Sequence, residues 1–223
     1  MRKASEKRSD LSPMPWKLVA LVTALSALTD YALASPQPVH AQSEVTARRF
    51  QKPIVIDGLL EETCWPDAGR VSNFTEYSPR EGAKPEVETE VLLGYDATYL
   101  YIGFLCYEND CSKIRSTRAE RDALLDIQND DLIMIALDLY DTSYKGFILY
   151  LNPQGVQADD FSDERAEIYD LAVDLEWKAK SRILDDRWTA EIAVPFKSLR
   201  FPSAARQHWR VDFIRARPRL SEQ

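Results

Sequence analysis

Histidine and paired carboxylates are the side chains from which this chain could build a catalytic site. Its only histidines are His40 and His208, so the sequence nearly excludes a Ser-His-Asp triad and a histidine-rich metal centre. The 36 Asp and Glu residues leave room for glycoside hydrolysis, which needs two carboxyl groups about 5–10 Å apart. No local motif singles out such a pair, and we therefore expect a non-catalytic protein.

Planar polar side chains and one exposed aromatic ring could instead bind a carbohydrate. Sugar rings pack their C–H faces on aromatic rings, and their hydroxyl groups need partners such as Asn, Asp and Arg. In an extended segment Tyr150 shares a face with Asn152, so we expect Tyr150 to be the stacking platform of a polysaccharide or oligosaccharide site. The rim of this predicted site consists of Arg121, Asp130, the loop at Ile127, and Trp177 at the end of a strand.

Acidic residues are densest in the segment 159–164, which contains Asp159, Asp160 and Asp163. Closely spaced carboxylates can hold Ca²⁺, which takes about 6–8 oxygen ligands. These three residues are therefore the candidate metal ligands. The alternative is a solvated acidic loop without a metal, because charged side chains are mostly exposed.

Short apolar segments between turns predict that these side chains are positioned by an all-β fold. Three hairpins are expected, formed by residues 88–95 with 99–107, 131–139 with 146–151, and 177–184 with 188–194. Asn152-Pro-Gln-Gly155 is typical of a β-turn, a further strand is expected over 208–214, and helix is expected only as short segments near 59–65 and 116–126. The fold class is an antiparallel, jelly-roll-like β-sandwich.

The N-terminus has the composition of a targeting segment. Basic residues precede an apolar run, 18–28, that is too short to span a membrane and fits the centre of a secretory signal peptide. Cleavage is expected after Ala34 or after Ala41, and an uncleaved anchor is the alternative. We expect an exported protein (periplasmic, outer-membrane-associated or extracellular) with a linker over 35–47, because those residues are small, polar and proline-containing.

The charge balance argues against a nucleic-acid partner. The formal net charge is −8, and residues 1–34 carry five basic and three acidic side chains, so removing them leaves −10. Such a surface repels phosphate backbones.

Two of the three cysteines, Cys64 and Cys106, and three tryptophans are expected to be mainly core residues. An odd number of cysteines (Cys64, Cys106 and Cys111) argues against a disulfide-built scaffold, although a bridge between Cys106 and Cys111 stays open. Trp65, Trp188 and Trp209 flank or begin strands whose alternation directs them inward.

Short motifs recur in a fixed order along residues 48–216: Ile56-Asp-Gly58 with Trp65, Leu100-Tyr-Ile102, Asp130-Asp131, Asn152-Pro-Gln-Gly155, and Trp188-Thr-Ala-Glu191 with Pro195-Phe196. In this order they resemble the family 9 carbohydrate-binding modules, which are secreted β-sandwiches. The resemblance is closest to a subgroup found at the N-terminus of large exported bacterial proteins of unclear role, which Arg121-Asp122 and Phe201 also fit. It implies a non-catalytic module for plant polysaccharide of the xylan or cellulose type, linked to carbohydrate catabolism and carrying calcium. Residues 217–223 are then a tail or a truncated end.

The chain departs from this family at the sugar-binding positions. Sugar-binding members use a clamp of two Trp residues; Ile127 stands at one of these positions, and the other lies beyond the last expected strand. Tyr150 replaces an Arg expected before Asn152. The alternative function is therefore a structural or interaction domain of a larger envelope protein, without sugar affinity and associated with the outer membrane through that longer parent.

Overall fold

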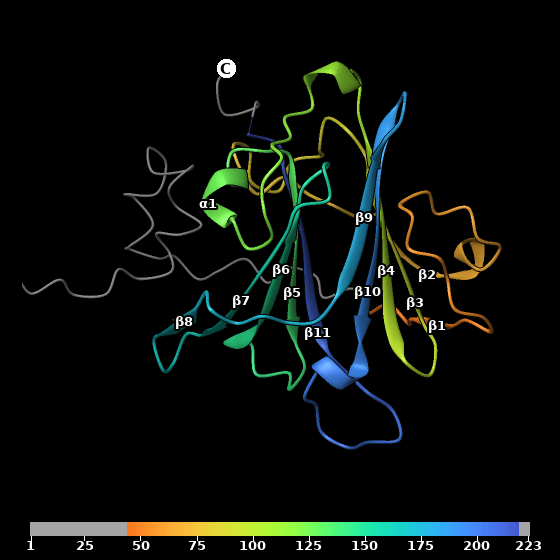
Figure 1. The fold of residues 1–223 in the computed structure, drawn as a ribbon, viewed down its shortest axis with the longest axis vertical. Helices are drawn as coiled ribbons and strands as arrows, with labels where there is room; N and C mark the ends of the chain where they lie inside the picture. The colour runs from red at the N-terminus through yellow and green to blue at the C-terminus, as the bar shows by residue number, and fades with distance from the viewer. Residues whose placement is uncertain (1–43, 219–223) are drawn as a thin grey trace, which may run out of the picture. The chain divides into compact units, whose positions relative to one another are not determined.

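The structure, a computed structural model, describes residues 44–218. These residues form two β-sheets, which Figure 1 shows as two layers of strands with the short helix α1 (Leu124–Ile127) beside one of them. The predicted signal peptide, 1–34 or 1–41, lies outside the described residues, as do parts of the predicted linker 35–47 and tail 217–223. No helix within residues 44–218 is long and apolar enough to cross a membrane.

Sheet A contains two of the three predicted hairpins. Its strand order is β1-β3-β4-β10-β9, with β2 also paired to β3. The β3–β4 and β9–β10 pairs are antiparallel, as predicted, and β1 runs parallel to β3. The strands are β1 (Arg48–Arg49), β2 (Gly69–Val71), β3 (Thr89–Tyr95), β4 (Tyr99–Tyr107), β9 (Lys178–Ile183) and β10 (Arg187–Pro195).

Sheet B contains the third predicted hairpin, β5–β6, and has the order β11-β5-β6-β7-β8. The strands are β5 (Leu132–Asp138), β6 (Lys145–Leu151), β7 (Gln157–Asp163), β8 (Ile168–Asp170) and β11 (Arg210–Ala216). The acidic-loop prediction for 159–164 is wrong, because most of that segment belongs to β7 and pairs with β6.

Helical structure among the described residues is limited to α1 and three short 3₁₀ turns. The 3₁₀ turns are η2 (Trp65–Asp67), η3 (Cys111–Lys113) and η4 (Phe196–Ser198). The helix expected near 116–126 is only the four residues of α1, since an isolated helix this short has little stability of its own.

The main core lies between the sheets. Ile133 and Ile135 of β5 belong to one buried cluster with Ile102 and Phe104 of β4. Trp188 belongs to the same cluster and is fully buried. Burial of each such side chain stabilises the fold by about 1.5–3 kcal/mol. The inward orientation predicted for Trp188 is confirmed.

The other predicted core residues are buried to different degrees, and Cys64 is only half-buried. Trp65 is buried, whereas Trp209 is half-buried and packs against Phe196 and Phe201. All three cysteines are free thiols, so the structure contains no Cys106–Cys111 bridge; Cys106 is fully buried, which raises the pKa of its thiol to about 12.

The outer face of sheet A is covered by the chain that precedes β2, and a buried carboxylate fixes this segment. Glu191 of β10 accepts hydrogen bonds from the backbone N–H groups of Asp57, Gly58 and Leu60, at 2.9, 2.8 and 3.2 Å. It also accepts one from the indole N–H of Trp65, at 3.1 Å. β3 and β4 are apolar on both faces, because one face packs in the main core and the other packs under the covering segment. The motifs around Asp57-Gly58 and Glu191 therefore have a structural role.

Candidate ligand-binding site

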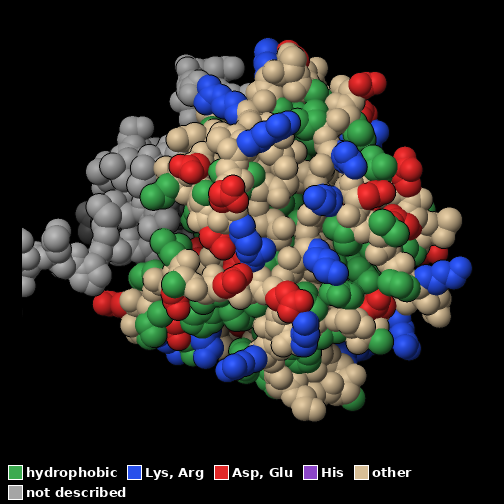
Figure 2. Space-filling view, in the orientation of Figure 1, with side chains coloured by type: hydrophobic (Ala, Val, Ile, Leu, Met, Phe, Trp, Pro, Cys, Tyr) green, Lys and Arg blue, Asp and Glu red, His purple; other side chains and the backbone are tan. Residues whose placement is uncertain are grey.

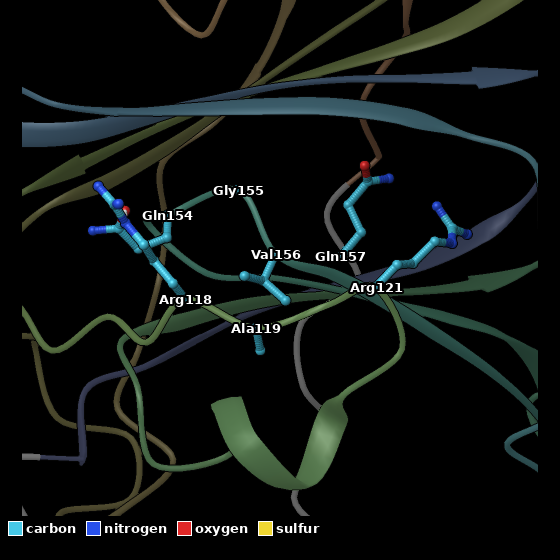
Figure 3. A pocket seen from close by; sticks show the side chains of 7 residues that line it. All are labelled: Arg118, Ala119, Arg121, Gln154, Gly155, Val156 and Gln157. Atoms are coloured by element: carbon cyan, nitrogen blue, oxygen red, sulfur yellow. Dashed lines mark hydrogen bonds between the residues drawn. The ribbon is translucent and has the colours of Figure 1, made fainter.

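One pocket lies where the chain before α1 meets the turn before β7. It has a volume of about 440 Å³, within the range of about 300–1,000 Å³ that is common for small-molecule sites. Its described lining consists of Arg118, Ala119, Arg121, Gln154, Gly155, Val156 and Gln157. Figure 3 shows Arg118 and Gln154 at one end, Arg121 and Gln157 at the other, and Ala119 and Val156 between them.

The predicted β-turn forms one wall of the pocket. The Gly155 N–H donates to the Asn152 carbonyl at 2.9 Å, and Gly155 has a φ of 81°, which favours glycine. The Asn152 side-chain oxygen accepts the N–H groups of Gln154 and Val156 at 3.0 and 2.9 Å. The turn predicted from Asn-Pro-Gln-Gly is thus confirmed, and its asparagine holds it closed.

Asn152 and Asp130 join this turn to the opposite wall. The Asn152 amide donates to the Thr117 carbonyl and to an Asp130 carboxylate oxygen, both at 2.8 Å. Asp130 in turn accepts the backbone N–H and hydroxyl of Thr117, at 2.7 and 2.9 Å. Asn152 and Asp130 are both buried. They position the pocket and do not line it.

Arg121 is oriented by a second buried carboxylate. Its Nη2 lies 2.6 Å from Asp159 Oδ1 and donates to the Leu175 carbonyl at 2.7 Å. Asp159 also accepts the Trp177 indole N–H at 2.9 Å, and the Arg121 guanidinium lies over the Trp177 ring, 5.8 Å from its centroid. The structure therefore brings the predicted residues Arg121 and Trp177 together, although Trp177 is buried and forms no part of the described lining.

Tyr150 lies on the other face of sheet B from Asp159. Its hydroxyl donates to Asp160 Oδ2 at 2.8 Å, and its half-buried ring packs in a cluster with Ile127 and Val156. Burial is the main cause that raises the pKa of Tyr150 above its usual range. Stacking on a sugar needs an exposed ring face, so we assign Tyr150 no ligand contact. Ile127 is fully buried and is not a rim residue.

The three candidate calcium ligands are not brought together. Asp159 and Asp160 are neighbours on β7, so their side chains point to opposite faces. Asp159 is bonded to Arg121 and Asp160 to Tyr150, while Asp163 accepts the backbone N–H groups of Arg165 and Ala166. Within residues 44–218 there is no group of three or more His, Cys, Asp or Glu that could hold a metal ion. These carboxylates do not fit the oxygen cage that Ca²⁺ requires.

Sequence reasoning missed three of the polar lining residues: Arg118, Gln154 and Gln157. Arg118 Nε is 3.4 Å from the Gln154 side-chain oxygen, and the Gln157 amide donates to the Trp177 carbonyl at 3.3 Å. Gln154 lies within the recognised turn motif, and its place in that turn was the available signal.

The lining offers guanidinium and amide groups around an apolar middle, and none of the described lining residues is aromatic. It can donate several hydrogen bonds to a polar ligand.

Comparisons with known proteins find similarity to solved structures. No protein-family model matches the sequence, and no curated protein matches it. A solved family 9 carbohydrate-binding module from Caldicellulosiruptor kristjanssonii in complex with cellotriose is 17% identical to this chain, with a TM-score of 0.45. The match covers 67% of this chain and 66% of that module, so this chain spans just under two thirds of the module's length. The same kind of module from that organism in complex with glucose is 16% identical, with a TM-score of 0.48 over 75% of each chain.

A third structure is more similar in shape. It is a protein from Bacteroides uniformis ATCC 8492 that is provisionally named a carbohydrate-binding protein, 9% identical, with a TM-score of 0.56 over 76% of this chain and 81% of that one. The two share a fold. The antiparallel β-sandwich expected from the sequence is thereby confirmed.

Proposed function

We propose that this chain is an exported, non-catalytic carbohydrate-binding module whose ligand occupies the pocket between residues 118–121 and 154–157. The observation that carries the proposal is the lining itself, in which Arg118, Arg121, Gln154 and Gln157 surround an apolar middle. Guanidinium and amide groups match the hydroxyl pairs of a sugar, and the apolar middle matches its C–H edges. The described lining holds no nucleophile and no carboxylic acid, which supports binding over catalysis.

The proposed ligand is an oligosaccharide or polysaccharide, with cellulose or xylan as the first classes to test and carbohydrate catabolism as the setting. The fold shared with a provisionally named carbohydrate-binding protein supports this class. Hydrogen bonding without an aromatic platform gives a weak site, because most of a hydroxyl bond's energy is offset by lost water contacts. A dissociation constant of about 1 mM corresponds to only about 4 kcal/mol of binding free energy.

Export is supported by the apolar run 18–28 and the small residues that follow it.

A second candidate function is a structural or interaction domain of a larger envelope protein. The absence of an aromatic residue from the described lining favours it, because stacking supplies much of the affinity of sugar-binding sites. In that case the pocket is a by-product of the turn that joins β6 to β7, and association with the outer membrane comes through the longer protein.

Isothermal titration calorimetry with cellotriose and xylotriose tests the proposal. We expect binding in the millimolar range, weakened about tenfold or more by Arg118→Ala, since a lost charge-assisted hydrogen bond is worth about 1.5–3 kcal/mol. Arg206→Ala is the matched control, because Arg206 is an exposed arginine outside the pocket lining. Absence of heat with every sugar, in a protein that melts cooperatively, would leave the interaction-domain function in its place.

A further inference from the structure

A row of basic side chains follows the edge strand β9. Lys178, Lys180 and Arg182 alternate along this strand and are all exposed, whereas Ala179 between them is buried. Alternate residues of a strand lie about 7 Å apart on one face. The three cations therefore form a line along one edge of sheet A.

Within residues 44–218 these cations have no carboxylate partner. Among the described residues, no ion pair involves Arg118, Lys178, Lys180 or Arg182. Arg182 donates to the Asp57 carbonyl, and Lys178 lies over the Tyr99 ring, 5.7 Å from its centroid. A line of unpaired positive charge is unexpected in a chain with a net charge of −8.

The two ends of the pocket differ in charge. At one end Arg121 is surrounded by carboxylates, at 2.6 Å from Asp159 and 3.4 Å from both Asp122 and Asp174. At the other end, Arg118 has one side-chain hydrogen bond, from Nε to Gln154, so its two terminal nitrogens have no partner within the described residues. The Arg118 end of the pocket is therefore the end that can bind an anion.

Both ends of the pocket adjoin β9 or the residue before it, since the Gln157 amide at the far end donates to the Trp177 carbonyl. The Ser181 hydroxyl donates to the Asn152 carbonyl at 3.1 Å, which packs the turn that carries Gln154 against β9. The Ser181 side chain lies on the opposite face of β9 from Lys180 and Arg182, so a ligand that leaves the pocket reaches the cation row across this edge of sheet A. Figure 2, in the orientation of Figure 1, shows Lys and Arg side chains over the middle of the face in view, along the course of β9. Asp and Glu side chains lie mainly to either side.

We propose that the ligand is an acidic polysaccharide, whose uronic-acid carboxylate binds Arg118 and Gln154 while neighbouring carboxylates lie along the β9 row. This inference rests on the proposed function and names its ligand class. A guanidinium binds a planar carboxylate through two parallel hydrogen bonds, which the free terminal nitrogens of Arg118 can provide. The β9 row adds a longer-range attraction for further charges along the same chain.

Nucleic acid fits this surface less well. A duplex presents a dense row of phosphates, and the net negative charge of the chain opposes it beyond the β9 row. A polyuronate carries one charge per sugar and a ring with hydroxyl groups, which suits a single guanidinium beside amide side chains.

The test compares trigalacturonic acid with cellotriose and xylotriose by calorimetry, in about 20 mM and about 500 mM NaCl, since salt screens exposed charges. We expect trigalacturonic acid to bind about tenfold more tightly than the neutral sugars in low salt, the size of effect that a charge-assisted pair supplies. The preference should shrink in high salt. A short duplex DNA serves as a second polyanion and should bind more weakly than trigalacturonic acid.

Two variants assign the effect to its residues. Arg118→Gln should remove most of the preference for the acidic sugar, and Lys180→Gln should reduce its salt dependence. Arg206→Gln and Lys52→Gln, exposed cations outside the pocket and β9, should change neither. Cooperative melting of each variant checks that it is folded.

The outcomes separate the two proposals. Equal binding of neutral and acidic sugars overturns the ligand class proposed here and leaves carbohydrate binding intact. DNA binding as tight as that of trigalacturonic acid also overturns it, because the surface then attracts any polyanion. No binding of any sugar removes the proposed function and this inference with it.

Discussion

The substitution Glu191→Gln tests whether the buried carboxylate of β10 holds the covering segment on sheet A. Oε2 accepts the N–H groups of Asp57 and Gly58, and Oε1 accepts those of Leu60 and the Trp65 indole. Glutamine has nearly the same shape but replaces one of the two acceptor oxygens with an NH₂ group. Two of the four donors then lose their acceptor and face another donor.

The structure sets the size and sign of the effect. Each buried polar group left without a partner costs about 1–3 kcal/mol, so two cost about 2–6 kcal/mol. Glutamine also removes a buried charge, whose desolvation is the main cause that raises the pKa of Glu191, and this gain offsets part of the loss. We expect Glu191→Gln to lower the free energy of unfolding by about 2–4 kcal/mol.

Urea unfolding followed by tryptophan fluorescence measures this difference, because Trp65 is one of the affected donors. Glu61→Gln is the matched control, as Glu61 is an exposed residue of the same segment, and it should change stability by less than about 0.5 kcal/mol. A Glu191→Gln protein as stable as the parent would refute the reasoning, since it would mean that the two lost hydrogen bonds contribute no net stability.

Three further perturbations have defined outcomes. Asp160→Asn should raise stability by about 3 kcal/mol at pH 7.5 and very little at pH 4. Burial raises the pKa of Asp160 to about 6, so the native state binds its proton more tightly than the unfolded chain, and stability falls as the pH rises from about 4 to about 6. A constant difference across a pH series of melts would contradict this. Gly94→Ala should cost about 1–3 kcal/mol in urea unfolding, because its Cβ would overlap the buried Phe50 ring; an unchanged midpoint would show that the ring moves aside. EDTA should leave the melting temperature unchanged, since Asp159, Asp160 and Asp163 face different partners, and a lower melting temperature would point to a metal site elsewhere.

Local pattern was sufficient to predict the strands whose residues alternate or whose turns have a strong signature. The β3–β4 pair is continuous apolar sequence around a short turn, and the turn at Asn152 is encoded by four consecutive residues. In contrast, β7 begins Gln-Ala-Asp-Asp, and Asp is disfavoured in strands. Its carboxylates are satisfied by Arg121 and Tyr150, 38 and 10 residues away. Partners at such separations have no local signature.

The candidate site was only partly predictable for the same reason. Asn152 and Asp130 were recognised as polar residues near a turn, but their hydrogen bonds to each other and to Thr117 make them supports of the pocket. The lining residue Arg118 becomes a neighbour of Gln154 only after segments 36 residues apart meet. Tyr150 was chosen from strand alternation, which gives the face of a side chain and not what covers that face.

The pairing order of the strands has a consequence for how the chain folds. Sheet A places β10 against β4, and sheet B places β11 against β5, so each sheet is completed by a strand that is synthesised many residues later. The contacts of Glu191 with Asp57, Gly58 and Leu60 close a loop of more than 130 residues. Such distant pairings give a high contact order, and proteins of this kind fold over milliseconds to seconds. The β11–β5 pair can therefore form only after Arg210–Ala216 has left the ribosome.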